Sequence, residues 1–112
     1  MAIFEYGEYQ NTYEAPDNLV EIFENSAAKY ANNLFIGEKD SSGEYQWVTY
    51  AQIATRVNNL RAGLASLGVQ AGDTVGIIAN NRKEWVIAEI ATQGLRAAFV
   101  PMYEKELVTM WK

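Results

Sequence analysis

The segment between residues 72 and 104 constrains the fold more than any other part of this 112-residue chain. Residues 74–79 are apolar on both faces except at Gly76, which is typical of a buried parallel strand. Residues 82–93 then have helical periodicity, and residues 97–102 form a second apolar run of strand length. The order strand, helix, strand predicts one parallel βαβ unit.

The predicted helix over residues 82–93 is apolar around almost its whole circumference. Asn81 and Glu84 have the spacing of a capping box at its start, and Gly94 closes it. Such a helix needs partners on more than one side, so we expect this chain alone to leave a large apolar helix face exposed. The sequence therefore predicts that the chain is part of a larger body.

A helix and a hairpin are predicted in the first half of the chain. Residues 19–31 form an amphipathic helix, with Asn18 as its N-cap and Glu21 at the capping-box spacing. Residues 34–39 and 45–50 are short strands on either side of a polar turn that ends in glycine, which predicts a β-hairpin.

A second helix is predicted directly after the hairpin. Thr49 and Gln52 have capping-box spacing, and Gly68 stands where a left-handed C-cap belongs. The apolar stripe of this helix covers barely two heptads, which favours a helix packed on a sheet over a coiled coil. The predicted fold class is α/β, a partial doubly wound layer with a β-hairpin and one parallel βαβ unit. The stripe consists of Ile53, Val57, Leu60, Leu64 and Leu67.

Composition excludes several classes of function. The chain has no Cys and no His, so it can form no disulfide, no Cys nucleophile, no imidazole base and no Cys/His zinc site. Its net charge of -5 and its scattered basic residues argue against nucleic-acid binding. The longest apolar run, residues 97–103, is far too short to span a membrane, and the first residues lack the features of a secretory signal. A soluble, cytoplasmic protein is expected.

The polar residues Asn80, Asn81 and Arg82 follow the first predicted parallel strand. Ligands of open parallel sheets bind beyond the carboxyl ends of the strands, and an anion could accept N–H bonds from the start of the next helix there. Capping alone explains asparagine at such a position, so a helix cap with a solvated arginine is the favoured interpretation.

No other residues form a pattern that indicates catalysis. The carboxylate pairs Glu21/Glu24 and Glu38/Asp40 lie on an amphipathic helix and at a turn, where solvated charge explains them. No Gly-Lys-Ser or Gly-Lys-Thr phosphate loop is present. The prediction is that this chain contains no catalytic, cofactor-binding or metal-binding residue. Trp47, Trp85 and Trp111 are interpreted as isolated packing residues.

Four motifs nevertheless occur in a recognisable order. They are Trp-Val-Thr-Tyr at 47–50, Gly-Val with Gly-Asp-Thr-Val-Gly-Ile between 68 and 77, Asn-Arg-Lys-Glu-Trp at 81–85 and Val-Pro-Met-Tyr-Glu at 100–104. With the first helix they cover about residues 18–104. In this order and spacing the chain resembles the AMP-forming acyl-CoA synthetases, and most closely the long-chain fatty-acid–CoA ligases.

The resemblance implies that this chain is an N-terminal fragment of such a ligase. Residues 1–17 would be an N-terminal arm, residues 18–104 the N-terminal portion of the AMP-binding synthetase domain, and residues 105–112 a truncated start of the next helix. The full-length enzyme would use ATP with Mg²⁺ to turn a fatty acid into an acyl-adenylate and then transfer the acyl group to coenzyme A. The family's phosphate loop, ribose-binding Asp and C-terminal Lys have no counterpart here, so the resemblance implies no catalytic residue in this chain, which would be inactive alone.

Two alternatives stay open at this stage. Short- and medium-chain ligases and other adenylate-forming enzymes share the pattern, and the residues of the acyl pocket would lie outside this chain. A non-catalytic α/β interaction module derived from the same fold is the alternative from another class. Peripheral contact of the parent enzyme with a membrane is compatible with the sequence.

Overall fold

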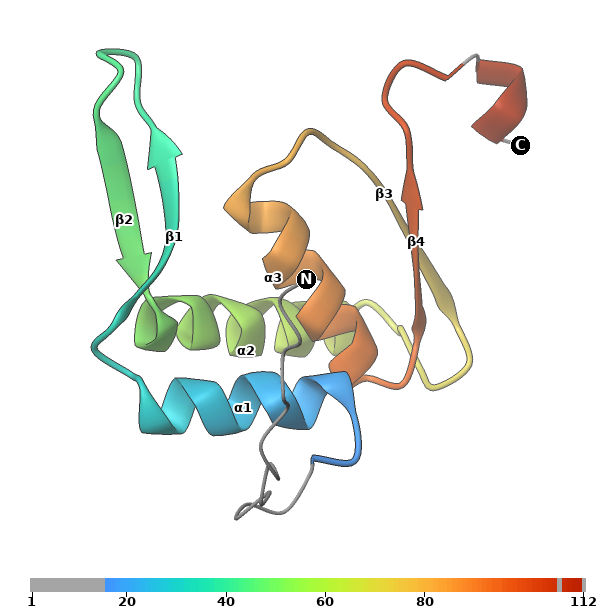
Figure 1. Cartoon of the computed structure of the whole chain (residues 1–112). Coiled ribbons are helices and arrows are strands. Elements are labelled where there is room, and N and C mark those ends of the chain that lie inside the picture. The colour runs from blue at the N-terminus through green and yellow to red at the C-terminus, as the bar shows by residue number, and fades with distance from the viewer. Residues whose placement is uncertain (1–15, 107, 112) are drawn as a thin grey trace, which may run out of the picture.

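The computed structural model describes residues 16–106 and 108–111, so almost all of the predicted arm, residues 1–17, lies outside the described residues. Figure 1 shows two separate pairs of strands on either side of a group of helices. The elements in chain order are α1 (Leu19–Lys29), β1 (Leu34–Lys39), β2 (Tyr45–Thr49), α2 (Tyr50–Ser66), β3 (Thr74–Ile78), α3 (Lys83–Gly94), β4 (Ala98–Met102) and the 3₁₀ helix η1 (Val108–Trp111).

The first pair of strands is the predicted hairpin. Strands β1 and β2 are antiparallel, with Lys39 opposite Tyr45 and Gly37 opposite Trp47. The Asp40 carboxylate holds the turn, because the Ser42 hydroxyl and the Gln46 amide donate to it at 2.6 and 2.9 Å. These two bonds, the hydroxyl first, lower the pKa of Asp40 to about 2.

The second pair of strands confirms the predicted parallel unit. Strands β3 and β4 are parallel, from Thr74 opposite Ala98 to Ile78 opposite Met102, and α3 connects them. The fold class is therefore mixed α/β with a β-hairpin and a parallel pair, as the sequence predicted.

The local signals for helix boundaries are confirmed in α1 and α2. The Asn18 side chain accepts from the backbone N–H of Glu21 at 2.9 Å, at the start of α1. Thr49 and Gln52 form the complete capping box of α2, with bonds of 3.2 and 2.8 Å. Gly68 follows α2 with φ +98°, the left-handed conformation that glycine adopts at least cost.

The core lies where the three helices meet. Its two central residues, Ile53 of α2 and Ala91 of α3, are fully buried, and Phe35 of β1 packs against its edge. Apart from Leu67, which follows α2 and is 83% exposed, the apolar stripe predicted for α2 therefore faces other helices more than a sheet. The buried residues of this core are Phe23, Ala27, Ile53, Val57, Ile87 and Ala91.

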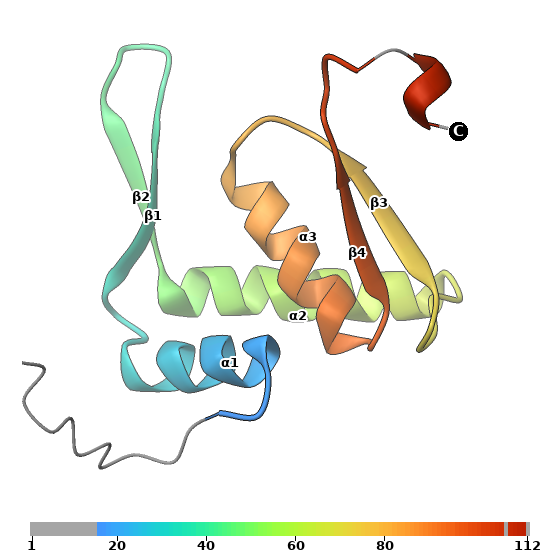
Figure 2. The same cartoon turned by 45° about the vertical axis from the view of Figure 1, so that its right-hand side comes forward.

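One expectation about α3 is wrong. The helix was predicted to expose a large apolar face, yet none of its residues is exposed. Helices α1 and α2 cover one side of α3, and β3 and β4 cover another (Figure 2). Apolar side chains are exposed at several other places, including the far side of the parallel strands, where Ile78 is 44% exposed and Val100 is 40% exposed.

Candidate functional site

The loop between β3 and α3 is the place where the sequence suggested a ligand-binding edge. Arg82 is the N-cap of α3, in extended conformation and without a side-chain capping bond. The prediction that Asn81 caps this helix in a capping box with Glu84 is therefore wrong. Helix α3 begins one residue later than predicted, at Lys83.

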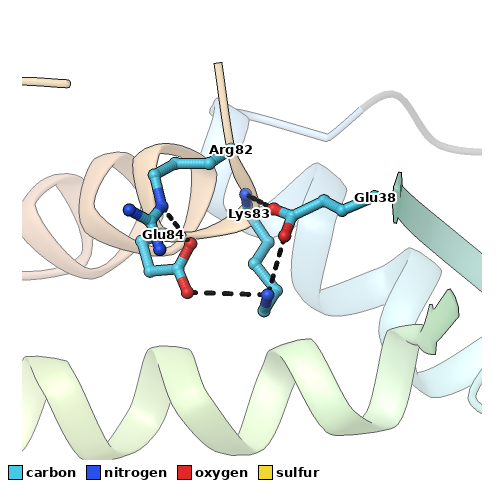
Figure 3. A network of polar contacts seen from close by, with 4 residues as sticks. All are labelled: Glu38, Arg82, Lys83 and Glu84. Atoms are coloured by element: carbon cyan, nitrogen blue, oxygen red, sulfur yellow. Dashed lines mark hydrogen bonds and ion pairs between the residues drawn. The ribbon is translucent and has the colours of Figure 1, made fainter. Parts of the chain in front are cut away.

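The first turn of α3 is capped by a residue from the hairpin. Glu38 of β1 accepts a bond from the backbone N–H of Lys83 at 2.5 Å and a second from the Lys83 ammonium at 2.8 Å (Figure 3). The carboxylate thus occupies the position that an anionic ligand would take at a helix N-terminus. The N-terminus of α3, where the sequence allowed an external anion to bind, is therefore already occupied by the carboxylate of Glu38.

The electrostatics of Glu38 follow from this position. The hydrogen bond from the Lys83 side chain, and next the one from its backbone, lower the pKa of Glu38 below its ordinary value. The side chains of Glu38 and Lys83 are both less than a third exposed. The earlier interpretation of Glu38 as solvated charge is therefore wrong, and no local motif in the sequence could have shown this contact between residues 45 positions apart.

Arg82 is paired within its own turn. Its guanidinium donates to the Glu84 carboxylate at 2.8 Å, and the Lys83 ammonium lies 3.6 Å from the same carboxylate (Figure 3). The bond between Arg82 and Glu84 lowers the pKa of Glu84 and raises that of Arg82. The Arg82 side chain is 56% exposed, as predicted for a solvated arginine, but Arg82 stands at the N-cap position that was predicted for Asn81, and Glu84 neutralises its charge.

The third residue of the predicted edge, Asn80, lies apart from this network. With its amide nitrogen turned toward Glu104, it donates to both carboxylate oxygens at 2.5 and 2.6 Å. Glu104 follows β4, so this contact joins the two strands at their carboxyl ends. Arg82 and Asn80, which the sequence placed at one edge, therefore have different partners. Arg82 pairs with Glu84, and Asn80 pairs with Glu104.

The remaining candidate residues have structural contacts. Glu24 pairs with Arg61 at 3.3 Å, while Glu21 accepts from the backbone N–H of Asp17 at 2.7 Å. Trp85 packs against Phe99 with the ring planes at 90° and the centroids 5.1 Å apart. Because Glu21 and Glu24 bond to different partners, their carboxylates do not form an acid–base pair.

Within residues 16–106 and 108–111, no three Asp, Glu, His or Cys side chains gather as a metal site would require. Nor does any helix in this part of the chain combine the length and the hydrophobicity that crossing a bilayer requires. An open groove of about 740 Å³ runs between the start of α1 and the end of α3 and is lined by charges of both signs, including Glu21, Arg61 and Arg96. The prediction that this chain carries no catalytic, cofactor-binding or metal-binding residue stays a prediction.

The sequence matches a known family over most of its length. The sequence profile described as AMP-binding enzyme matches residues 23–106. Fatty acyl-CoA synthetase A of Dictyostelium discoideum is 38% identical over 80 residues, which are 67% of this chain and 12% of that protein. The peroxisomal long chain acyl-CoA synthetase 7 of Arabidopsis thaliana is 35% identical over 92 residues, 79% of this chain and 13% of that protein.

Solved structures agree with this match at the level of the fold. The crystal structure of IdnL1 superposes with a TM-score of 0.78 at 23% identity, and covers 88% of this chain and 20% of that one. The fatty acid AMP ligase from Legionella pneumophila superposes with a TM-score of 0.71 at 17% identity, over 82% of this chain and 16% of that one. This chain thus spans a small fraction of the proteins that it matches.

Proposed function

Because this chain belongs to the family of AMP-binding enzymes, we propose that it is the N-terminal portion of the synthetase domain of a long-chain fatty-acid–CoA ligase. The observation that carries the proposal is the family match over residues 23–106, which begins within α1 and includes the hairpin, α2, α3 and both parallel strands. The similarity to named long-chain synthetases supports the substrate class.

In the proposed full-length enzyme a fatty-acid carboxylate attacks the α-phosphate of ATP. Pyrophosphate would leave, and the acyl-adenylate would then pass its acyl group to the thiol of coenzyme A and release AMP; Mg²⁺ would accompany the ATP and offset the charge of its phosphates. This chain would bind none of these cofactors by itself. Its contribution would be structural, because Glu38, Arg82 and Glu84 are all engaged in internal ion pairs.

The partners and the location of the full-length enzyme follow from the same proposal. It would bind fatty acid, ATP and coenzyme A but no nucleic acid, consistent with the net charge of -5. We propose a cytoplasmic enzyme whose contact with membranes, if it has any, is peripheral. The chain would function with the remainder of the synthetase fold.

A second candidate is a non-catalytic interaction module with this fold. One observation favours it: the helices already enclose a core in which Ile53 and Ala91 are fully buried and Val57 and Ile87 almost so. A core of this kind would allow the chain to fold without the rest of a synthetase.

A chimera tests the first proposal. The 80-residue region of the Dictyostelium synthetase that matches this chain is replaced by the aligned residues of this chain, and acyl-CoA formation from a long-chain fatty acid is measured. We expect ATP-dependent thioester formation. A chimera that folds but forms no acyl-adenylate would contradict the proposed ligase function.

A thermal melt of the isolated chain separates the two candidates. The melt is followed by circular dichroism in the presence of a dye that reports exposed apolar surface. A synthetase segment should melt over a broad range and bind the dye strongly. A sharp transition with little dye binding would favour the interaction module.

A further inference from the structure

The groove between the start of α1 and the end of α3 contains two arginines from different parts of the chain. The two helix ends lie close together in both views (Figures 1 and 2), and the groove between them has a volume of about 740 Å³. Arg61 reaches the groove from α2, and Arg96 follows the end of α3. Sites for small molecules have volumes of roughly 300–1,000 Å³, so the groove is large enough for such a ligand.

Arg96 has a backbone conformation that arginine adopts only at a cost. Its φ of +59° lies in the left-handed region, and it is the one residue other than glycine with such a value in the described part of the chain. Glycine adopts this conformation freely after the end of a helix. Backbone strain of this kind is concentrated at functional sites. The Arg96 side chain has no hydrogen-bond or ion-pair partner among the described residues, so no internal contact of that side chain offsets the strain.

The end of α3 leaves room for the second arginine. A Cβ atom at Gly94 would lie 2.8 Å from Nη1 of Arg61, so the guanidinium lies in the space that a larger residue at position 94 would take. Its Nη2 donates to the side-chain oxygen of Asn58 at 2.6 Å, and its Nη1 donates to Glu24 at 3.3 Å. A guanidinium has five N–H donors, and these two bonds leave others for a ligand. Arg61 is therefore held in place and still able to donate.

The charges of the groove leave Arg96 without a neutralising neighbour. Of the two glutamates in the groove, Glu24 pairs with Arg61, and Glu21 lies in the first turn of α1, where the helix dipole offsets its negative charge. Arg96 is an exposed residue that forms no such pair among the described residues. The groove thus offers one unpaired cation beside a guanidinium with spare donors, which favours an anionic ligand.

We propose that this groove binds a small amphipathic carboxylate. The carboxylate accepts two parallel N–H bonds from the Arg96 guanidinium, the geometry that arginine and carboxylate prefer, and Arg61 donates a further bond. The apolar part of the ligand lies on Leu19 and Val20, which form the apolar wall of the groove. Leu19 is 64% exposed, so the ligand removes apolar surface from water there. This assignment goes beyond the proposed ligase function and does not depend on it.

A titration of the nitrogen-15-labelled chain with octanoate, followed by amide NMR spectra, tests the proposal. Octanoate should shift the amide signals of residues 18–21 and 93–96. Arg96→Gln should weaken binding by about tenfold or more, because it removes a charged partner of the carboxylate. Arg56→Gln is the matched control, since Arg56 is an exposed arginine of α2 outside the groove, and it should bind octanoate like the unchanged chain. Equal binding by the two variants, or no shift at the groove, would overturn the proposal.

Two further probes separate the head of the ligand from its tail. Acetate has the carboxylate without the apolar chain, and octyltrimethylammonium has the chain with a cationic head. Both should bind about tenfold more weakly than octanoate or worse. Leu19→Ser should weaken the binding of octanoate and leave that of acetate unchanged. Equal affinity for octyltrimethylammonium and octanoate would overturn the assignment to an anion, and equal affinity for acetate and octanoate would overturn the amphipathic class.

Arg96→Gly distinguishes a role in binding from a role in the fold. Glycine relieves the left-handed conformation, so this variant should unfold at a higher temperature than the unchanged chain and should still lose octanoate binding. A variant that unfolds at a lower temperature would show that the Arg96 side chain supports the fold, and would contradict the ligand-binding role.

A second measurement covers a chain that gives no dispersed amide spectrum. The 107 residues of long chain acyl-CoA synthetase 4 of Arabidopsis thaliana that match this chain are replaced by it, and equilibrium dialysis counts the octanoate that the chimera binds. The chimera with Arg96→Gln should bind one octanoate fewer than the chimera with Arg56→Gln, and equal numbers would overturn the proposal. Formation of acyl-CoA by the same chimera is a separate readout that tests the ligase function and not the groove.

Discussion

Removing the negative charge of Glu38 should loosen the first turn of α3. The Glu38 carboxylate accepts from the backbone N–H and from the ammonium group of Lys83. A capping bond contributes about 1 kcal/mol, and we add about 0.5 kcal/mol for an ion pair whose side chains are partly exposed. Glu38→Ala should therefore destabilise the turn by about 1.5 kcal/mol. Glu38→Gln keeps an acceptor for the N–H and should lose about half of that amount.

Hydrogen exchange of the amides in α3 measures this effect residue by residue. A loss of about 1.5 kcal/mol corresponds to exchange that is roughly tenfold faster. Because the folded pKa of Glu38 is lower than the unfolded one, its stabilisation is complete above the unfolded pKa and is lost as the pH falls through the folded pKa. The unchanged chain and Glu38→Gln should therefore converge in acid. A carbon-13 NMR titration of Glu38 should give a low pKa that rises in Lys83→Met.

Glu44→Gln is the control, because Glu44 is an exposed residue in the same hairpin. It should leave exchange in α3 unchanged. The reasoning is refuted if Glu38→Gln accelerates exchange no more than Glu44→Gln does at neutral pH. It is also refuted if the difference between Glu38→Gln and the unchanged chain persists below the folded pKa.

Three further substitutions test other parts of the structure. Thr92 is fully buried, and its hydroxyl has no hydrogen-bond partner among the described residues. Thr92→Val should therefore leave the free energy of unfolding unchanged or raise it by about 1 kcal/mol, measured by chemical denaturation. A loss of stability would show that the hydroxyl is bonded. Thr49→Ala removes the cap that Thr49 forms with Gln52, and should lower the stability of α2 by about 1 kcal/mol, measured by circular dichroism; unchanged helicity would contradict the capping role. A Cβ at residue 37 would lie 2.8 Å from the ring of Trp47, so Gly37→Ala should displace that ring and shift its fluorescence to longer wavelength, whereas Gly63→Ala, with open space around it in α2, should not.

The elements with local signals could be predicted from the sequence. The start of α2 depends on Thr49 and Gln52, three positions apart, and the left-handed turn after it depends on Gly68. Strand β1 was predicted with its observed bounds, because apolar residues end at a polar turn. Helix α1 ends two residues before its predicted end, within the usual uncertainty of helix boundaries.

The errors concern contacts between distant parts of the chain. Asn81 and Glu84 have capping-box spacing, but Glu84 bonds to Arg82 and the cap comes from Glu38 of the hairpin. The all-round hydrophobicity of α3 predicted many partners correctly, but not that α1, α2 and the parallel strands of this chain would supply them. Periodicity indicates that a surface is covered and contains no information about which segment covers it.

The two capping arrangements also give the helices different dependence on the rest of the fold. Helix α2 carries its start signal within four residues, so it can begin to form while the chain around it is unfolded. Helix α3 receives its cap from a residue 45 positions earlier, a contact that requires the closure of a long loop. We therefore predict that α3 is completed late in folding, so that substitutions at Glu38 accelerate unfolding and leave the folding rate nearly unchanged. Through this single carboxylate the stability of the start of α3 depends on the position of the hairpin.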